Sequence, residues 1–165
     1  MACVATLSRV EIDIFLSSAS PGQQAIVRAL RDIITRRASG LTERVNTGKE
    51  LIELKSYLIF EGPGGQLVFA VGLTAARTVT VHLMPYDGSR ELHDRYAAAL
   101  GPFLVGKSCV RFADPAELPA DAIGAIADAT PRYLEVSTAG KTRPVRRWRA
   151  SRAGGPGPRR RPAGA

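Results

Sequence analysis

The segment from Thr42 to Met84 constrains the fold more than any other part of the chain, because its hydrophobic pattern has a period of two. This alternation is typical of β-strands with one buried face. It predicts strands over residues 43–47, 55–60, 66–73 and 77–84. The glycine- and proline-rich stretch 62–65 and the short stretch 74–76 separate the last three strands, which we therefore expect to form antiparallel hairpins.

A helix is predicted after Ser20, because Ser20 suits the N-cap, Pro21 the first helical position and Gln23 the capping box. Ser39 and Gly40 end this helix. Helical spacing predicts two more helices, over residues 89–100 and 120–129, with a fifth strand over residues 107–112 between them. The order α-β-β-β-β-α-β-α predicts an α+β fold, an antiparallel β-sheet of about five strands with helices packed on one face.

Positive charge is concentrated at the C-terminal end of the chain. Of the 23 lysines and arginines, nine lie within residues 139–165, which contain no acidic residue, so residues 1–138 carry 14 basic and 15 acidic side chains. The C-terminal stretch is rich in proline, glycine and arginine and has too little apolar surface to fold by itself. We therefore predict an α+β domain over residues 1–138 and a disordered basic tail over residues 139–165.

The two cysteines, Cys3 and Cys109, give neither a disulfide framework nor metal-ligand spacing. The first residues lack the charged and apolar regions of a secretory signal. No apolar stretch approaches the roughly 18 residues that would span a membrane. These features predict a cytoplasmic protein with no membrane partner.

Residues 101–108 read Gly-Pro-Phe-Leu-Val-Gly-Lys-Ser, a formal match to the phosphate-binding consensus GxxxxGK[ST]. A phosphate loop follows a buried strand and opens a helix, so that backbone N–H groups converge on phosphate oxygens. Here a helical pattern precedes the segment and a strand pattern follows it. We therefore interpret the match as a false phosphate loop. Because no catalytic constellation is found elsewhere, we predict a protein that is not an enzyme and uses no cofactor.

The same segment resembles the C-terminal signature of the YdhG-like domains, small bacterial domains of mostly unknown function. The matching positions include Gly106, Lys107, Cys109, Arg111, Phe112 and Pro119. The resemblance extends more weakly over about residues 10–130. It implies a small α+β binding domain in which the Gly-Lys pair belongs to a helix-to-strand turn.

One branch of the YdhG-like domains is described as frataxin-like and proposed to chaperone intracellular iron, which the resemblance implies as an alternative function. Iron binding of that type uses a surface ridge of carboxylates, which suits a hard, oxygen-seeking cation. Here the first helix holds Asp32 among four arginines, and the first strand offers Glu43 beside Arg44. Such a surface repels cations, so we predict no metal site.

The only histidines are His82, on the polar side of a predicted strand, and His93, on a predicted helix. A metal site would need them to join with a carboxylate such as Asp87, Glu91 or Asp94. The two histidines are not spaced as ligands on one helix. We interpret both as surface or hydrogen-bonded side chains.

Cys109 lies in the predicted fifth strand, with Lys107 and Arg111 two residues away on the same face. Neighbouring cations lower the pKa of a thiol and make it reactive. A buried cysteine with no chemical role is the alternative reading of the same position. We favour the buried, inert cysteine.

The tail is the second candidate binding element. The tail residues predicted to contact nucleic acid are Lys141, Arg143, Arg146, Arg147, Trp148, Arg149, Arg159, Arg160 and Arg161. Guanidinium groups neutralise phosphates, and an indole stacks on an exposed base. A solubilising extension whose charge has no specific partner is the alternative. The sequence thus leaves two functional classes open: an unknown ligand or protein bound by the folded domain, and non-specific nucleic acid bound through the tail.

Overall fold

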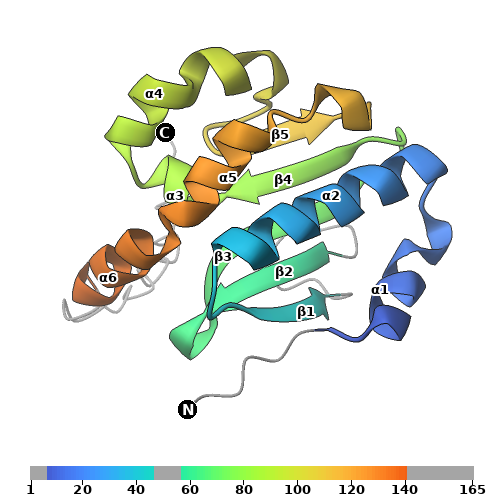
Figure 1. The fold of residues 1–165 in the computed structure, drawn as a ribbon, viewed down its shortest axis with the longest axis horizontal. Helices are drawn as coiled ribbons and strands as arrows, with labels where there is room; N and C mark the ends of the chain where they lie inside the picture. The colour runs from blue at the N-terminus through green and yellow to red at the C-terminus, as the bar shows by residue number, and fades with distance from the viewer. Residues whose placement is uncertain (1–6, 47–56, 141–165) are drawn as a thin grey trace, which may run out of the picture.

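The computed structural model describes residues 7–46 and 57–140 of the chain, and its helices and strands are shown in Figure 1. They follow one another as α1 (Arg9–Phe15), α2 (Pro21–Arg37), β1 (Thr42–Asn46), β2 (Tyr57–Gly62), β3 (Gln66–Leu73), β4 (Val79–Leu83), α3 (Met84–Asp87), α4 (Arg90–Leu100), β5 (Cys109–Phe112), α5 (Ala120–Asp128) and α6 (Thr130–Gly140). Short 3-10 turns follow α1, β2 and α4 and precede α5.

The sheet is antiparallel throughout, and its strands lie in the order β1-β2-β3-β4-β5, the same as their order along the chain. The turn between β2 and β3 contains Gly64 and Gly65, both with φ near +70° (73° and 74°), a conformation that side chains with a Cβ adopt only at a cost. The predicted α+β fold with an antiparallel five-stranded sheet is therefore confirmed.

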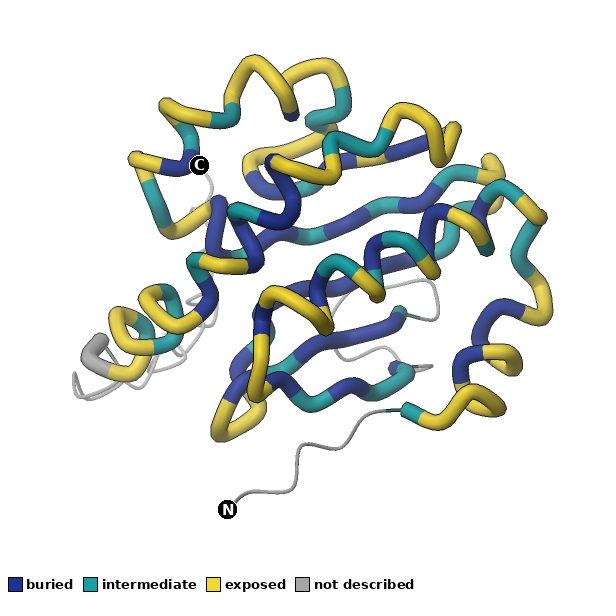
Figure 2. The backbone as a smooth tube through the Cα atoms, viewed as in Figure 1, coloured by how far each residue is buried: buried dark blue, intermediate teal, exposed yellow. Residues whose placement is uncertain are grey.

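The helices α2 and α5 lie next to each other across one face of the sheet (Figure 1). Figure 2 shows that the buried residues gather where these helices face the strands. Alternate residues of β4, namely Val79, Val81 and Leu83, point into this layer and are fully buried. The core is thus a two-layer arrangement with the helices on one side.

Capping hydrogen bonds define the start of α2, as the sequence predicts. The Ser20 hydroxyl accepts a hydrogen bond from the Gln23 N–H at 3.3 Å, and the Gln23 side chain accepts one from the Ser20 N–H at 3.0 Å. Pro21 occupies the first turn, and Gly40 has a φ of 85° beyond the end of the helix. The predicted capping box and stop signal are both confirmed.

The structure contains three helices that the predicted order lacks, namely α1, α3 and α6. The start of α1 has its own capping box, in which Ser8 and Glu11 bond reciprocally. The single turn of α3 is too short to give a periodic pattern. The last helix, α6, begins after a break at Ala129 and extends to Gly140, two residues beyond the predicted domain boundary. The rest of the predicted tail, 141–165, lies outside the described residues.

The segment 101–108 joins α4 to β5, so a helix precedes it and a strand follows it. Residues 101–103 form a 3-10 turn, and Leu104 makes an isolated bridge to Val110 of β5. The predicted order of helix, turn and strand is therefore confirmed for this segment. No helix within the described ranges is long and apolar enough to cross a bilayer.

Candidate functional site

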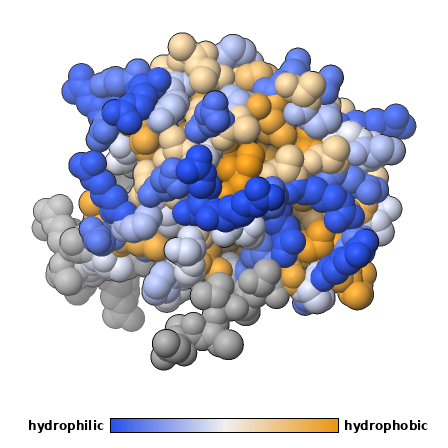
Figure 3. Space-filling view, in the orientation of Figure 1, coloured by the Kyte–Doolittle hydropathy of each residue, from blue (hydrophilic) through white to orange (hydrophobic). Residues whose placement is uncertain are grey.

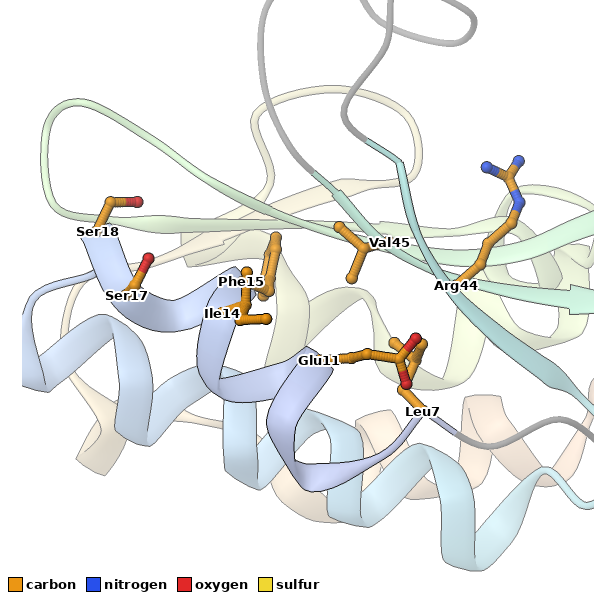
Figure 4. Close-up of a pocket in the computed structure, with 8 residues that line it drawn as sticks. All are labelled: Leu7, Glu11, Ile14, Phe15, Ser17, Ser18, Arg44 and Val45. Atoms are coloured by element: carbon orange, nitrogen blue, oxygen red, sulfur yellow. The ribbon is translucent and has the colours of Figure 1, made fainter.

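A cleft of about 500 Å³ opens between α1 and the edge strand β1 (Figure 4). We call it the α1–β1 cleft. Its lining residues are Leu7, Glu11, Ile14, Phe15, Ser17, Ser18, Arg44 and Val45. In Figure 4 the apolar side chains of Ile14, Phe15 and Val45 occupy the middle, with the two serines at one end and Glu11 at the other. Its volume lies within the range of small-molecule sites.

The position of α1 beside β1 depends on a buried carboxylate. Glu43 of β1 accepts hydrogen bonds from the Leu7 N–H at 2.9 Å and from Arg31 Nε and Nη2 at 2.9 and 2.8 Å. The Glu43 side chain is only 2% exposed. Arg31 also donates to the Leu7 carbonyl at 3.2 Å. A residue just before α1 is therefore bound through both its N–H and its carbonyl, and this bonding holds the start of α1 beside β1.

The two charged residues that line the α1–β1 cleft differ in their partners. Arg44 donates to the Glu61 carboxylate from Nε and Nη2 at 2.9 and 2.6 Å. Glu11 accepts the Ser8 N–H and hydroxyl, both on Oε2 and both at 2.9 Å. These Ser8 bonds lower the pKa of Glu11, so the carboxylate is ionised at neutral pH. No lysine or arginine in the described part of the chain forms an ion pair with it.

Two large apolar side chains of α1 are exposed to solvent. Val10 and Ile14, four residues apart on α1, are 66% and 67% exposed. Figure 3 shows hydrophobic surface over α1 among the hydrophilic side chains of this face. Exposed apolar side chains beside a concave site are typical of ligand-binding surfaces.

A second site lies on the sheet face away from α2 and α5. His82 of β4 and Cys109 of β5 are paired in register, and the Cys109 Sγ lies 2.9 Å from His82 Nδ1 and 4.0 Å from Nε2. Both side chains are half-buried. The Tyr57 ring stands edge-on to the His82 ring, with centroids 6.1 Å apart. The sequence pointed to both residues but did not predict that they form a pair.

Burial favours the neutral forms of both members of this pair. Desolvation lowers the pKa of His82. Desolvation also raises the pKa of Cys109, the Asp87 charge raises it further, and hydrogen bonds with Ser108 oppose the rise. At neutral pH the pair is therefore a thiol beside a neutral imidazole.

The other candidate positions from the sequence are not members of this pair. His93 stacks on Tyr86, with ring centroids 4.0 Å apart. Lys107 and Arg111 are exposed, and Phe112 is fully buried against Phe103. The remaining signature positions flank β5: Gly106 lies in the turn before the strand, and Pro119 directly precedes α5.

The structure gives no carboxylate ridge on α2 and β1. Asp32 is paired with Arg36 at 2.6 Å, and Glu43 is buried against Arg31. Across residues 7–46 and 57–140 there is no group of three or more histidine, cysteine, aspartate or glutamate side chains that would hold a metal ion. The tail residues proposed to contact nucleic acid, from Lys141 to Arg161, lie outside the described residues.

Comparison of the chain with protein-family models, with curated proteins and with solved structures finds no match in any of the three. The class of protein is therefore defined by the fold alone: an α+β domain with an open antiparallel sheet. The YdhG-like resemblance stays a prediction from the signature around β5.

Proposed function

We propose that this chain is a small, non-enzymatic binding domain of the YdhG-like type, and that its ligand is an amphipathic amine held in the α1–β1 cleft. The observation that carries the proposal is the ionised Glu11 carboxylate at one end of an apolar cleft. An ammonium group would pair with Glu11, and an apolar body would cover Ile14, Phe15 and Val45.

The state of Glu11 favours binding over catalysis. A carboxyl group with a lowered pKa is ionised at neutral pH, and it acts as a poor proton donor or shuttle there. Arg44 is paired with Glu61, as expected for a charge that has a structural role at the rim of the α1–β1 cleft. Both groups are therefore suited to fixing the orientation of a ligand.

Octylamine tests the proposal, with octanol and octanoate as probes of the same length. Isothermal titration should show octylamine binding more tightly than octanol, and octanoate more weakly than either. Glu11→Gln is the matched variant, because glutamine at this position preserves the capping box while removing the charge. It should reduce octylamine binding to the level of octanol, whereas Val136→Ala, at an exposed position on α6, should leave binding unchanged. Equal binding of octylamine and octanoate would refute the proposal.

A second candidate function is non-specific association with nucleic acid through the basic tail. It is favoured by the charge distribution, with nine basic and no acidic residues within 139–165. Full-length protein and a chain ending at Gly140 form the matched pair. The tail accounts for binding only if the shorter chain fails to retard DNA in a gel at low salt.

We also propose that the protein is located in the cytoplasm. Cys109 is a free thiol, which agrees with a reducing compartment, where thiols are kept from forming disulfides. The frataxin-like alternative receives no support from α2 and β1, since Asp32 and Glu43 are both paired with arginines.

A further inference from the structure

Strand pairing in the sheet places a cysteine sulfur beside a histidine nitrogen. His82 and Cys109 are directly opposite each other on the paired strands β4 and β5. The Cys109 Sγ faces His82 Nδ1 at 2.9 Å, while Nε2 lies farther away at 4.0 Å. One particular imidazole nitrogen is therefore directed at the thiol.

A glycine lies close to the sulfur. A Cβ placed on Gly106 would lie 3.7 Å from Cys109 Sγ, in ordinary van der Waals contact. Because Gly106 has no side chain, the turn before β5 places no Cβ against the sulfur. On the other side, the edge of Tyr57 limits the movement of the His82 ring.

Charged groups of both signs lie near the sulfur. The negative charge of Asp87 acts on Cys109, whereas Lys107 and Arg111 are exposed and lie two residues away along the chain. A cation bound by the sulfur is attracted by Asp87 and neutralises the thiolate. A neutral imidazole offers a nitrogen lone pair to such a cation.

We propose that Cys109 Sγ and His82 Nδ1 form a two-donor site for a soft monovalent cation, Cu(I). Thiolate and imidazole donors both suit this ion. Two donors are enough for Cu(I), which accepts near-linear coordination, whereas zinc needs about four ligands. This difference matters because residues 7–46 and 57–140 offer no group of three metal-binding side chains.

Binding exchanges one proton for one metal ion. The Cys109 S–H bond breaks, the proton leaves to solvent, and the sulfur and His82 Nδ1 each form a bond to copper, which stays Cu(I) throughout. Near-linear coordination separates the donors by roughly 4 Å, taking metal–ligand bonds of about 2 Å. Copper binding of this kind therefore requires Sγ and Nδ1 to move apart from their present separation of 2.9 Å, and Gly106 presents no Cβ against the sulfur.

Anaerobic titration of the full-length protein with Cu(I), buffered by a competing chelator, tests this site. The second cysteine, Cys3, is replaced in all samples by Cys3→Ser, so that only Cys109 can supply a thiolate. We expect one copper per chain, together with loss of thiol reactivity toward a disulfide reagent. Cys109→Ser should abolish binding. His82→Gln should weaken it by more than the roughly tenfold that loss of an outer-shell partner costs.

His93→Gln is the matched control, because His93 stacks on Tyr86 and should leave copper affinity unchanged. Circular dichroism of every variant shows whether the fold is intact. The proposal fails if copper still binds to Cys109→Ser, or if His82→Gln binds as tightly as the parent protein. Tighter binding of Zn²⁺ than of Cu(I) would also overturn it, as would modification of Cys109 by electrophiles at an unchanged rate when copper is present.

Discussion

Glu43 is a buried carboxylate whose three hydrogen bonds join three parts of the molecule. Its bonds reach the backbone before α1 and the Arg31 guanidinium of α2, while Glu43 itself belongs to β1. A buried ion pair contributes little net stability compared with an apolar pair, but the loss of one partner leaves the other charge unsatisfied. Glu43 is therefore more important for the position of α1 than for the total free energy of folding.

Glu43→Ala should reduce the free energy of unfolding by about 3 kcal/mol, at the low end of the range for broken buried pairs because Arg31 is 27% exposed. Asp32→Ala is the control: its pair with Arg36 is exposed, so it should change stability by no more than about 0.5 kcal/mol. Urea denaturation measures both. Equal effects of the two substitutions would show that Glu43 does not hold α1.

The pair of His82 and Cys109 predicts how stability depends on pH. The pKa of His82 is lowered from 6.5, so the unfolded chain takes up a proton before the folded one, and stability falls as pH drops below about 6.5. The pKa of Cys109 is raised from 9.0, so the unfolded thiol ionises first, and stability falls as pH rises above about 9. Both groups leave stability unchanged between these limits.

Denaturant unfolding between pH 5 and pH 10 would separate the two contributions. His82→Gln should flatten the acid side only, and Cys109→Ser should reduce the alkaline slope. Tyr57 and Tyr86, whose pKa values are also raised by burial, keep part of the alkaline slope in the Cys109 variant. An acid side with the same slope in His82→Gln as in wild type would contradict the assignment to His82.

Among the elements, α6 shows how a terminal helix is attached to a sheet. The Tyr133 hydroxyl donates to the Leu67 carbonyl of β3 at 3.2 Å. The Leu134 side chain covers Gly62 of β2, where a Cβ would lie 2.5 Å from Leu134 Cδ2. The absence of a side chain at Gly62 thus allows α6 to pack against the β2–β3 hairpin.

Gly62→Ala should lower the free energy of unfolding by about 1 kcal/mol, at the low end of overpacking costs, because the new methyl group displaces only the flexible end of the half-buried Leu134 side chain. The added cost should largely disappear in a Leu134→Ala background, where the overlap is removed, and a double-mutant cycle would measure this coupling. Gly101→Ala is the control, since nothing lies within 4 Å of the Cβ it would add. The same loss of stability in both backgrounds would argue against this contact.

The strands could be predicted from the sequence because their pattern is local, whereas three helices were missed for different reasons. The hairpins of β2, β3 and β4 follow from alternation and turn residues within a single stretch of chain. The capping box at Ser8 and Glu11 is visible in the sequence, so α1 was predictable in principle. In α6 few residues are buried, since Tyr133 and Leu134 are only half-buried, and its apolar pattern is correspondingly weak.

Neither candidate site could be predicted, because each one joins distant parts of the chain. Cys109 and His82 meet only through the register of β4 with β5. The long connection through α3 and α4 does not fix this register as a short hairpin turn would. The α1–β1 cleft likewise requires Glu43 to bring the start of α1 against β1. The sequence shows which residue types are present, but only the tertiary structure shows which of them are neighbours.

In the whole molecule, positive charge is concentrated in the C-terminal residues 139–165, whereas the preceding domain is nearly neutral. If about six of the nine basic residues contact phosphates of duplex DNA, log K should fall with log salt concentration at a slope of roughly −5. Fluorescence anisotropy at several salt concentrations measures this slope. Trp148→Ala should weaken binding to single-stranded DNA more than to duplex DNA, because only exposed bases stack on the indole. A slope near zero would show that the basic residues do not contact phosphates.

The strand order β1-β2-β3-β4-β5 bears on how the chain assembles as it leaves the ribosome. Each strand pairs with the one made just before it, so no strand waits for a partner synthesised much later. The helix α5 is the exception, because it covers the same face as α2 and is made after the whole sheet. Until α5 has been synthesised, the nascent protein exposes the part of its core that α5 covers. A chaperone that binds exposed apolar surface would act during this interval.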